Sequence, residues 1–282
     1  MTKAIRSDLT GGVLNLTLCR PDEYNTITPQ LRAELASALD EAEHDDAVSV
    51  ILLDAEGPAF CAGYDLGLFT AAQDRGEDAG DGHWDSSADL HLIGPYAQTW
   101  ARLHDIPKPT IAAVSGWCIA GGTNIVFNAD IIIAAESARF GYPPSRVWGV
   151  PEAPWTWVAR MGPERARRYM LTGDEFTGRE AAEMGAILEC VPDDALASTS
   201  RSLAERIALV PRNQLEMVTR SINQVARAMY DPAGSRLLGT LFDGVARHTA
   251  EGEAFVRRAT EVGFRQAVRE RDEPFGDYGE RK

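Results

Sequence analysis

The sequence predicts an α/β core followed by a helical C-terminal portion. Two patterns indicate this class. Up to about Val191, short apolar runs that suit strands alternate with segments of helical periodicity, and only helical periodicity continues beyond that residue. Several of the strand-like runs are almost continuously apolar, which is typical of strands covered on both faces in a parallel sheet.

The strands are expected where apolar runs end in turn signals. The first run ends at Arg20-Pro21, and the run VSVILL is followed by Gly57-Pro58. The runs TIAAV and IIIA have the same apolar character, and LECV is a last short strand. The predicted strands therefore span residues 12–18, 48–53, 110–114, 131–134 and 188–191.

The helices are expected where apolar residues recur every three or four positions. Pro29 opens the first of them, in which Leu31, Leu35 and Leu39 share one face. The predicted helices span residues 29–45, 90–103, 121–128, 163–173, 178–185, two helices within 195–229, and the chain beyond 239. Residues 71–87 are polar, rich in glycine and aspartate and without periodicity, which predicts a mobile surface loop or lid.

Composition excludes several classes of function. The 282 residues carry a formal net charge of −14, which argues against nonspecific binding to nucleic acid through phosphate contacts. No apolar stretch approaches the ~20 residues needed to cross a bilayer. The basic residues near the N-terminus precede no hydrophobic run, so a cytoplasmic protein is expected. The 4 cysteines lie far apart and suit reduced core positions, and no metal site is predicted.

Two glycine-bearing turns follow buried strands and could carry chemistry. They are the segment from Ala59 to Leu66 and the segment from Ala120 to Thr123, which opens a helix. The first N–H groups of a helix have no partner within it, and glycine allows another group to approach closely. One N–H from each turn could form an oxyanion hole for a thioester or ester carbonyl.

These turns belong to a larger set of motifs in a fixed order. The motifs are RPDEYNTIT (20–28), GPAFCAGYDL (57–66), KPTIAAVSGWCIAGGTNIVFNADIIIA (108–134), ARFGYP (138–143) and LTGDEFTGREAAEMGAILECV (171–191). With them the chain resembles the crotonase (enoyl-CoA hydratase/isomerase) superfamily over about residues 5–270. The resemblance implies a crotonase-like spiral of ββα turns in residues 1–195. It also implies a C-terminal helical region in residues 196–282 for trimerisation and closure of the site.

The resemblance further implies an acyl-CoA thioester substrate, no cofactor apart from the CoA of that substrate, and a homotrimer or a dimer of trimers. The oxyanion donors are expected to be the N–H groups of Ala62 and Gly121. Basic residues of the tail, Arg265, Arg269 and Arg271, would assist CoA binding, often from a neighbouring subunit. The other substrate-contacting residues are expected to be Arg20, Ala59, Cys61, Tyr64, Leu66, Gly122, Tyr142, Pro144 and Trp148.

The chain departs from the family pattern where the family's hydratases carry two glutamates. The corresponding positions hold Asn124 and Pro144. An amide can orient water but cannot accept a proton at neutral pH, and proline has no polar side chain. Glu152 is the first candidate to replace these acids, although it could instead be a carboxylate favoured at a helix N-terminus. Asp65 is the second candidate, although it could instead cap its own turn.

The sequence therefore predicts an enoyl-CoA hydratase-like enzyme that stabilises a thioester enolate in an oxyanion hole. Three alternatives stay open: an isomerase or hydrolase acting on an unusual CoA ester, a hydrolase of a β-diketone, and an inactive protein that binds acyl-CoA. Trp148, Trp155 and Trp157 cluster near the expected acyl pocket. They are either core residues or a device that selects a short, flat or cyclic acyl group.

Overall fold

The computed structural model describes residues 3–67 and 86–276, and its larger sheet has 6 strands in the order β1-β2-β3-β5-β7-β10. The first two strands are antiparallel, and every later neighbouring pair is parallel. The strands are β1 (Ile5–Thr10), β2 (Val13–Leu18), β3 (Val50–Ala55), β5 (Thr110–Val114), β7 (Ile131–Ala135) and β10 (Glu189–Val191). The predicted α/β class and all five predicted strands are confirmed, while β1 escaped the sequence analysis.

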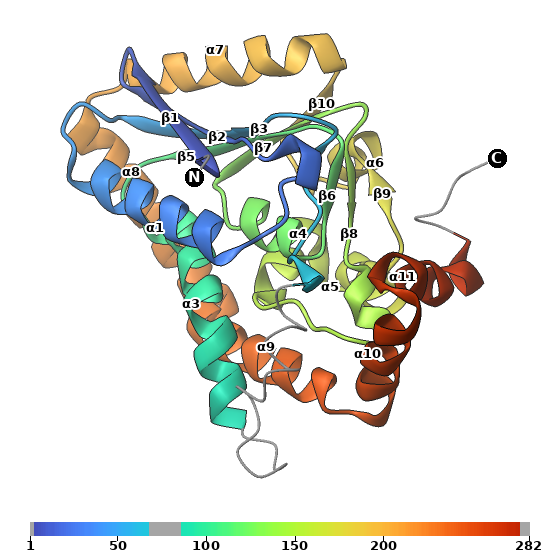
Figure 1. Ribbon diagram of the computed structural model, residues 1–282. Helices are drawn as coiled ribbons and strands as arrows, with labels where there is room; N and C mark the ends of the chain where they lie inside the picture. The colour runs from blue at the N-terminus through green and yellow to red at the C-terminus, as the bar shows by residue number, and fades with distance from the viewer. Residues whose placement is uncertain (1–2, 68–85, 277–282) are drawn as a thin grey trace.

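Helices cover this sheet on both faces, which explains its apolar strands. Along β3, Val50 and Leu52 face one way and pack with Leu196 and Ala204 of α7 (Leu196–Ala208). The intervening Ile51 belongs to the main core on the opposite face. Figure 1 shows α7 lying across one face of the sheet, while α1 (Pro29–His44) and α4 (Gly121–Val126) lie on the other side.

A second sheet of 4 very short strands runs beside the first, in the order β4-β6-β8-β9. Its strands are β4 (Ala59–Cys61), β6 (Trp117–Ile119), β8 (Arg139–Gly141) and β9 (Phe176–Thr177). The first three each follow a strand of the larger sheet, so the chain repeats a strand–strand–helix unit, as the expected spiral of ββα turns requires. Strands of two or three residues are too short to show a periodicity, which is why the sequence did not reveal them.

The remaining helices are α3 (Ser86–Asp105), α5 (Pro154–Thr172), α6 (Gly178–Glu183), α8 (Arg212–Tyr230), α9 (Pro232–Arg247), α10 (Ala250–Val262) and α11 (Phe264–Asp272). Helix α5 starts well before the predicted position because it combines two helical pieces across a kink at Gly162, whose φ is 78°. Of the loop expected at residues 71–87, positions 71–85 lie outside the described residues. None of the helices that the structure describes is long and apolar enough to span a membrane.

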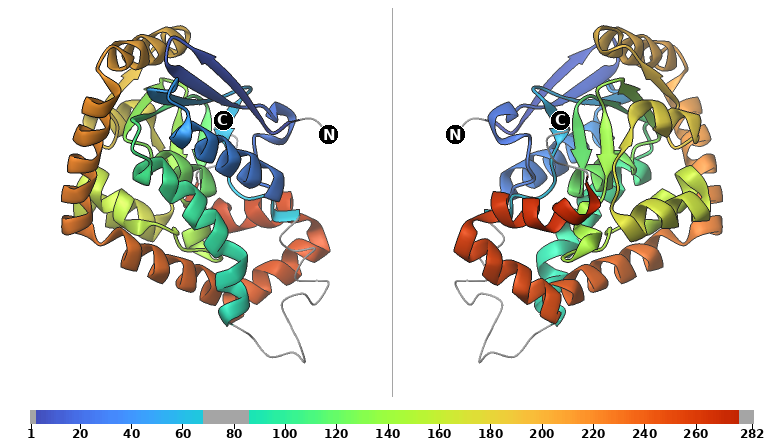
Figure 2. Two further views of the ribbon diagram at one scale, coloured as in Figure 1. Left: turned by 90° about the vertical axis from the view of Figure 1, so that its left-hand side faces the viewer. Right: turned by 90° about the vertical axis from the view of Figure 1, so that its right-hand side faces the viewer.

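The C-terminal helices return to the core that precedes them in sequence. Figure 2 shows α8 and α9 running along the outside of the molecule and α10 and α11 folding back against it. Phe255 of α10 and Ala267 of α11 pack with Val147 and Trp148, which follow the second sheet. These helices thereby form one wall of the cavity described next.

Candidate active site

The cavity, of about 190 Å³, lies where the turns after β4 and β6 meet the C-terminal helices. Its core side includes both glycine turns and the residues after β8, and its other side is helical. The lining residues are Ala62, Tyr64, Leu66, Ile93, Ile119, Ala120, Gly121, Tyr142, Pro143, Pro144, Trp148, Asp243, Arg247, Phe255, Val268 and Arg271. An apolar concavity with few polar groups is the usual form of a small-molecule site.

The pairing of β4 with β6 places the two glycine turns side by side. The strands are parallel with Cys61 opposite Cys118, so their following residues leave the sheet together. A Cβ on Gly63 would lie 2.8 Å from the Ala120 Cβ, and one on Gly122 would lie 2.3 Å from the Cys61 carbonyl oxygen. Only glycine allows this close approach of the two backbones.

The Gly121 N–H is directed by an unusual backbone conformation. Ala120 precedes α4 with φ 52° and ψ −123°, a region that favours glycine. Among the described residues, no hydrogen-bond acceptor is found for the Gly121 N–H, and this residue lines the cavity. Backbone strain of this kind persists where the surroundings fix it, and it concentrates at functional sites. Gly121 therefore lies beside the cavity with an open N–H, and its role as an oxyanion donor stays a prediction.

The expectation for Ala62 is wrong, because its N–H donates to the Tyr24 carbonyl at 3.1 Å. The neighbouring peptide has a different orientation. Tyr64 forms a parallel bridge with Ile27, in which Ile27 N–H donates to Gly63 O at 2.8 Å and Asp65 N–H donates to Ile27 O at 3.0 Å. Because peptide groups alternate along an extended strand, the Tyr64 N–H points away from Ile27. A Cβ on Gly63 would be 3.4 Å from the Gly121 nitrogen, so this peptide adjoins Gly121.

Glu152 is buried directly behind Tyr64. The Tyr64 hydroxyl donates a short hydrogen bond to Glu152 Oε1 and accepts one from Trp100 Nε1 at 3.2 Å. Glu152 is 2% exposed, and its Oε2 has no hydrogen-bond partner within the described part of the chain. Burial raises the pKa of Glu152 to about 8, against the smaller opposing effect of the Tyr64 hydrogen bond. Glu152 itself does not line the cavity, whereas Tyr64 does.

Asn124 lies next to this carboxyl group. Its side chain is buried, and its Nδ2 has no hydrogen-bond partner among the residues described. Burial raises the pKa values of both Glu152 and Tyr142, and Asn124 weakly lowers them, so its amide lies near both groups. Asn124 therefore brings an amide close to a carboxyl from another segment.

The helical wall contains a carboxylate and a guanidinium that the sequence analysis missed. Asp243 and Arg247 both belong to α9 and form an ion pair of 2.9 Å, in which Arg247 is buried and Asp243 is partly buried. Arg247 also lies 3.6 Å from Asp89 of α3, which contacts His248 Nε2 at 3.0 Å. Their spacing of four residues would have placed the two on one helical face. Nothing in the neighbouring sequence, however, indicates that this face of the helix turns toward the cavity.

Several expected site residues have structural roles instead. Ala59 and Cys61 are fully buried strand residues, and Gly122 packs on the Cys61 carbonyl. Arg20 donates from Nη1 to the Thr26 carbonyl at 2.9 Å, which ties it to its own turn. Asp65 donates its N–H to Ile27, and neither it nor these four residues line the cavity. Of the substrate-contacting residues expected from the sequence, Tyr64, Leu66, Tyr142, Pro144 and Trp148 do line it.

The other two tryptophans are packed elsewhere. Trp155 contacts the His104 ring with centroids 5.1 Å apart, and Trp157 contacts Phe127 at 4.9 Å. Trp157 is fully buried in the main core. Of the three, only Trp148 lines the cavity, where its Nε1 has no hydrogen-bond partner within the described residues.

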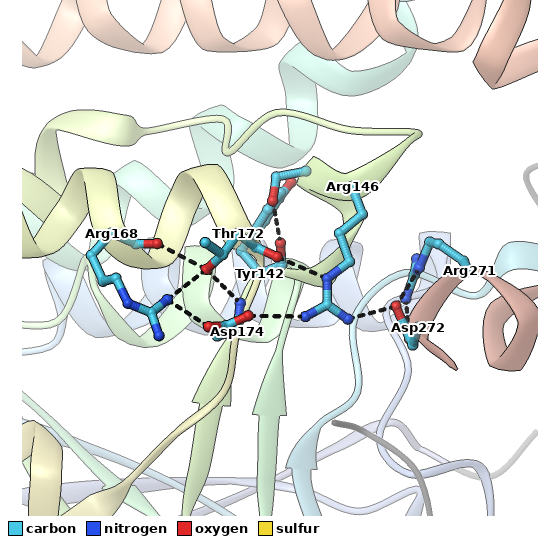
Figure 3. A network of polar contacts seen from close by, with 8 residues as sticks. Tyr142, Arg146, Arg168, Thr172, Asp174, Arg271 and Asp272 are labelled. Carbon is cyan, nitrogen blue, oxygen red and sulfur yellow. Dashed lines mark hydrogen bonds and ion pairs between the residues drawn. The ribbon is translucent and has the colours of Figure 1, made fainter. Parts of the chain in front are cut away.

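The basic tail reaches the cavity of its own chain through Arg271. A buried arginine, Arg146, holds the end of α11 in place: Nη1 contacts Asp272 at 2.9 Å and Nη2 contacts Asp174 at 3.3 Å. Figure 3 shows Arg146 lying between these two aspartates, with Arg271 on the far side of Asp272. Asp272 also binds Arg271 at 2.7 Å. The cavity is thus closed by the same polypeptide that supplies its core wall.

Comparison with known proteins agrees with this architecture. The enoyl-CoA hydratase/isomerase family model matches residues 8–257. The 1,2-epoxyphenylacetyl-CoA isomerase of Escherichia coli (strain K12) is 33% identical over 225 residues, covering 79% of this chain and 83% of its own. The hydroxycinnamoyl-CoA hydratase-lyase of Pseudomonas fluorescens is 31% identical over 210 residues, covering 73% of this chain and 72% of its own.

Solved structures show the same likeness over almost the whole chain. An enoyl-CoA hydratase from Mycobacterium smegmatis is 40% identical, with a TM-score of 0.92 over 98% of this chain and 96% of its own. An enoyl-CoA hydratase/isomerase from Xanthobacter autotrophicus Py2 is 28% identical, with a TM-score of 0.85 over 98% of this chain and 99% of its own. The chain belongs to the enoyl-CoA hydratase/isomerase family, the crotonase superfamily.

Proposed function

We propose that this protein binds an acyl-CoA thioester with the carbonyl oxygen between the N–H groups of Gly121 and Tyr64. The open Gly121 amide beside the cavity carries this proposal. The adjoining Tyr64 N–H points away from its bridge partner and supplies the second donor. When the α-carbon loses a proton, negative charge moves to this oxygen. Fixed backbone donors stabilise that enolate without reorganising, because the strands already hold them in place.

Glu152 and Tyr64 provide a route for protons at the same site. A carboxyl with a pKa of about 8 can hold or release a proton near neutral pH, which suits general acid–base catalysis. Glu152 lies behind Tyr64, so we assign the contact with the substrate to the Tyr64 hydroxyl and the role of positioning and proton exchange to Glu152. Asn124 adds a further donor beside Glu152, because its Nδ2 makes no hydrogen bond within the described residues.

The reaction best supported is the hydration of an enoyl-CoA. Purified protein mixed with crotonyl-CoA should bleach the absorbance of the conjugated thioester. Glu152→Gln, which keeps the shape but cannot accept a proton, should lower kcat by about 100-fold or more, and Tyr64→Phe should do the same. Tight binding of enoyl-CoA esters of several chain lengths without turnover would contradict hydration and favour an inactive acyl-CoA-binding protein.

A second candidate is the isomerisation of a CoA ester whose acyl group contains a ring. Tyr64, Tyr142, Trp148 and Phe255 line the cavity, and the buried Trp148 Nε1 could donate to a polar group of the acyl chain. Two relatives are named for aromatic acyl-CoA substrates, 1,2-epoxyphenylacetyl-CoA and hydroxycinnamoyl-CoA. Turnover of an epoxyphenylacetyl-CoA, together with an unchanged absorbance of crotonyl-CoA, would favour isomerisation over hydration. Cleavage of a β-diketone without binding of any CoA ester would favour the hydrolase instead.

We propose that the reaction needs no cofactor beyond the CoA of the substrate, so dialysis against a chelator should leave turnover unchanged. All four cysteines are free thiols, which suits the reducing cytoplasm where we place the protein. A cytosolic fraction that lacks the protein would contradict this placement.

We also propose that the chain forms a homotrimer or a dimer of trimers. Large apolar side chains are exposed along α8 and α9, and an apolar face of this extent usually marks an interface. They are Met217, Val218, Ile222, Val225, Met229, Leu237, Leu238, Phe242 and Val245. Light scattering should give three or six times the chain mass, and Ile222→Glu should reduce it. A monomeric mass at micromolar concentration would contradict the proposal.

A further inference from the structure

Asp243 occupies a distinctive place in the cavity. The titratable side chains among the described lining residues are those of Tyr64, Tyr142, Asp243, Arg247 and Arg271. Of these, Asp243 alone is a carboxylate. Removal of a proton from carbon calls for a base of that kind in contact with the substrate, and Glu152 does not line the cavity.

Two contacts hold this carboxylate from opposite ends. The Val150 N–H donates to Oδ1 at 3.2 Å, and Arg247 Nη2 donates to Oδ2 at 2.9 Å. The first comes from the segment after β8 and the second from the next turn of α9. The carboxylate is thereby fixed in one orientation, which is what an acid–base residue needs before the substrate arrives.

The carboxylate lies beside Pro144, the position where the resemblance implies a glutamate in the family's hydratases. A Cβ on Gly149 would lie 2.8 Å from the Pro144 Cβ, 3.3 Å from Asp243 Oδ1 and 3.8 Å from the Tyr142 hydroxyl. These three groups therefore surround the same point. A carboxylate from α9 thus reaches the region where Pro144 offers no polar group.

We propose that Asp243 is a catalytic base that removes the α-proton of the bound thioester and returns it. This inference rests on the proposed oxyanion hole. The Asp243 oxygen forms a bond to the proton, the C–H electron pair becomes the enolate double bond, and the carbonyl π electrons move to the oxygen held by Gly121 and Tyr64. In reverse, the enolate carbon takes a proton from the Asp243 carboxyl. No other reactant is needed.

A purely structural role for Asp243 would be to balance the charge of Arg247. Asp89 is also 3.6 Å from that guanidinium, so Arg247 keeps a carboxylate partner without Asp243. The two aspartates differ in position, because only Asp243 lines the cavity. They therefore form a matched pair for experiment.

The surroundings also set the pH at which the base is active. On its own helix Asp243 faces Arg247, and from α3 it faces Asp89, which binds His248. Glu152 and Tyr142 face it from the core, and Arg271 lines the same cavity. Burial raises the pKa of Asp243, while Arg247 lowers it and Asp89 raises it further. The rate of proton abstraction should therefore increase as the pH rises through this elevated pKa.

The test measures exchange of the α-protons of butyryl-CoA in deuterated buffer by NMR, which requires enolisation but not hydration. Asp243→Asn should slow exchange by about 100-fold or more and remove the acidic limb of its pH profile. Measured above this limb, Asp89→Asn should stay within about threefold of the wild type, since it removes a carboxylate from the same arginine outside the cavity. Its acidic limb should move to lower pH, because Asp89 raises the pKa of Asp243. Asp243→Glu should recover part of the rate, and the binding constant of butyryl-CoA should change little in each variant.

The inference would be overturned if Asp243→Asn exchanged the α-protons of butyryl-CoA at the wild-type rate and with the wild-type pH profile. So would an absence of exchange in wild-type protein that binds butyryl-CoA. Equal losses of exchange rate in Asp243→Asn and Asp89→Asn would also overturn it. Such a result would mean that both variants act by removing a carboxylate from Arg247. Turnover of crotonyl-CoA tests the proposed hydration separately. A wild-type protein that exchanges the α-protons of butyryl-CoA but does not hydrate crotonyl-CoA would contradict only the hydration.

Discussion

The cavity has two walls of different construction. The core wall presents backbone: the peptides at Tyr64 and Gly121, held by the parallel pair β4 and β6. The helical wall presents side chains, including Asp243, Arg247 and Phe255, carried by α9 and α10. In the proposed mechanism the first wall polarises the carbonyl and the second moves the α-proton. Polarisation therefore depends on main-chain geometry, whereas removal of the α-proton depends on the side chain that α9 brings to the cavity.

The walls also differ in how they are held. The core turns are fixed by close backbone packing that only glycine permits. The helical wall is attached by apolar contacts around Trp148 and Phe255 and by the buried ion pairs of Arg146 and Arg247. Substitutions in one wall should therefore have effects that differ from those of substitutions in the other.

The largest effect concerns Glu152, which lies behind the core wall. Its pKa of about 8, compared with 4.5 for a free carboxyl, means that the folded state binds more protons than the unfolded state between these pH values. Stability should therefore fall as the pH rises from about 5 to 8, by about 1.4 kcal/mol per pKa unit of difference. Urea unfolding at fixed protein concentration should show this fall in the wild type and a flatter dependence in Glu152→Gln. Parallel curves for the two proteins would contradict it.

The next effect tests the attachment of the helical wall. Arg146→Met would leave Asp272 and Asp174 without their buried arginine and should cost about 3–5 kcal/mol. Arg168→Met is the matched control: Arg168 contacts the same Asp174 at 2.5 Å but is exposed, so its loss should cost no more than about 1 kcal/mol. Denaturant unfolding measures both. Arg146→Met should also raise KM for the acyl-CoA, because Arg271 and Val268 would lose their fixed position.

A smaller effect tests the core wall. In Gly122→Ala the new Cβ would lie 2.3 Å from the Cys61 carbonyl oxygen, so the two turns must move apart. We expect a destabilisation of about 1–3 kcal/mol and a lower kcat, since Gly121 would shift with its neighbour. Gly94→Ala in α3 is the control, because a Cβ there meets nothing within 4 Å and should stabilise the helix by about 0.5–1 kcal/mol. Equal changes in the two variants would show that close packing of the turns is unimportant.

The smallest effect concerns the conformation that directs the Gly121 amide. Ala120 has φ 52°, which costs a non-glycine residue about 1–3 kcal/mol. Ala120→Gly relieves this strain but makes the unfolded chain more flexible, at a cost of about 0.5–1 kcal/mol. A net stabilisation of about 1 kcal/mol is expected in thermal or urea unfolding. A loss of stability would show that Ala120 fits its position without strain.

The sequence by itself determined much of the core. Apolar runs located β2, β3, β5, β7 and β10 of the larger sheet, because strands buried on both faces need apolar residues throughout. Glycines marked the two turns because a close approach of backbones leaves no room for a side chain. The motifs indicated the family. They also indicated a glycine turn at Gly121, which lines the cavity, because its position follows from the local pattern of a strand, a turn and a helix start.

Only the tertiary structure decided how the site is completed. The Ala62 amide is taken by Tyr24, which lies in a distant turn and forms no local pattern with it. Asp243 lies beside Pro144 because α9 packs against the segment after β8, some hundred positions earlier in the chain. Periodicity reports which face of a helix is apolar, but not which cavity that face will meet. The stretch AGGTN therefore predicted the amide donor that we propose at Gly121, because that geometry is local. The groups that we propose for proton transfer come from distant elements, so only their packing brings them to the cavity.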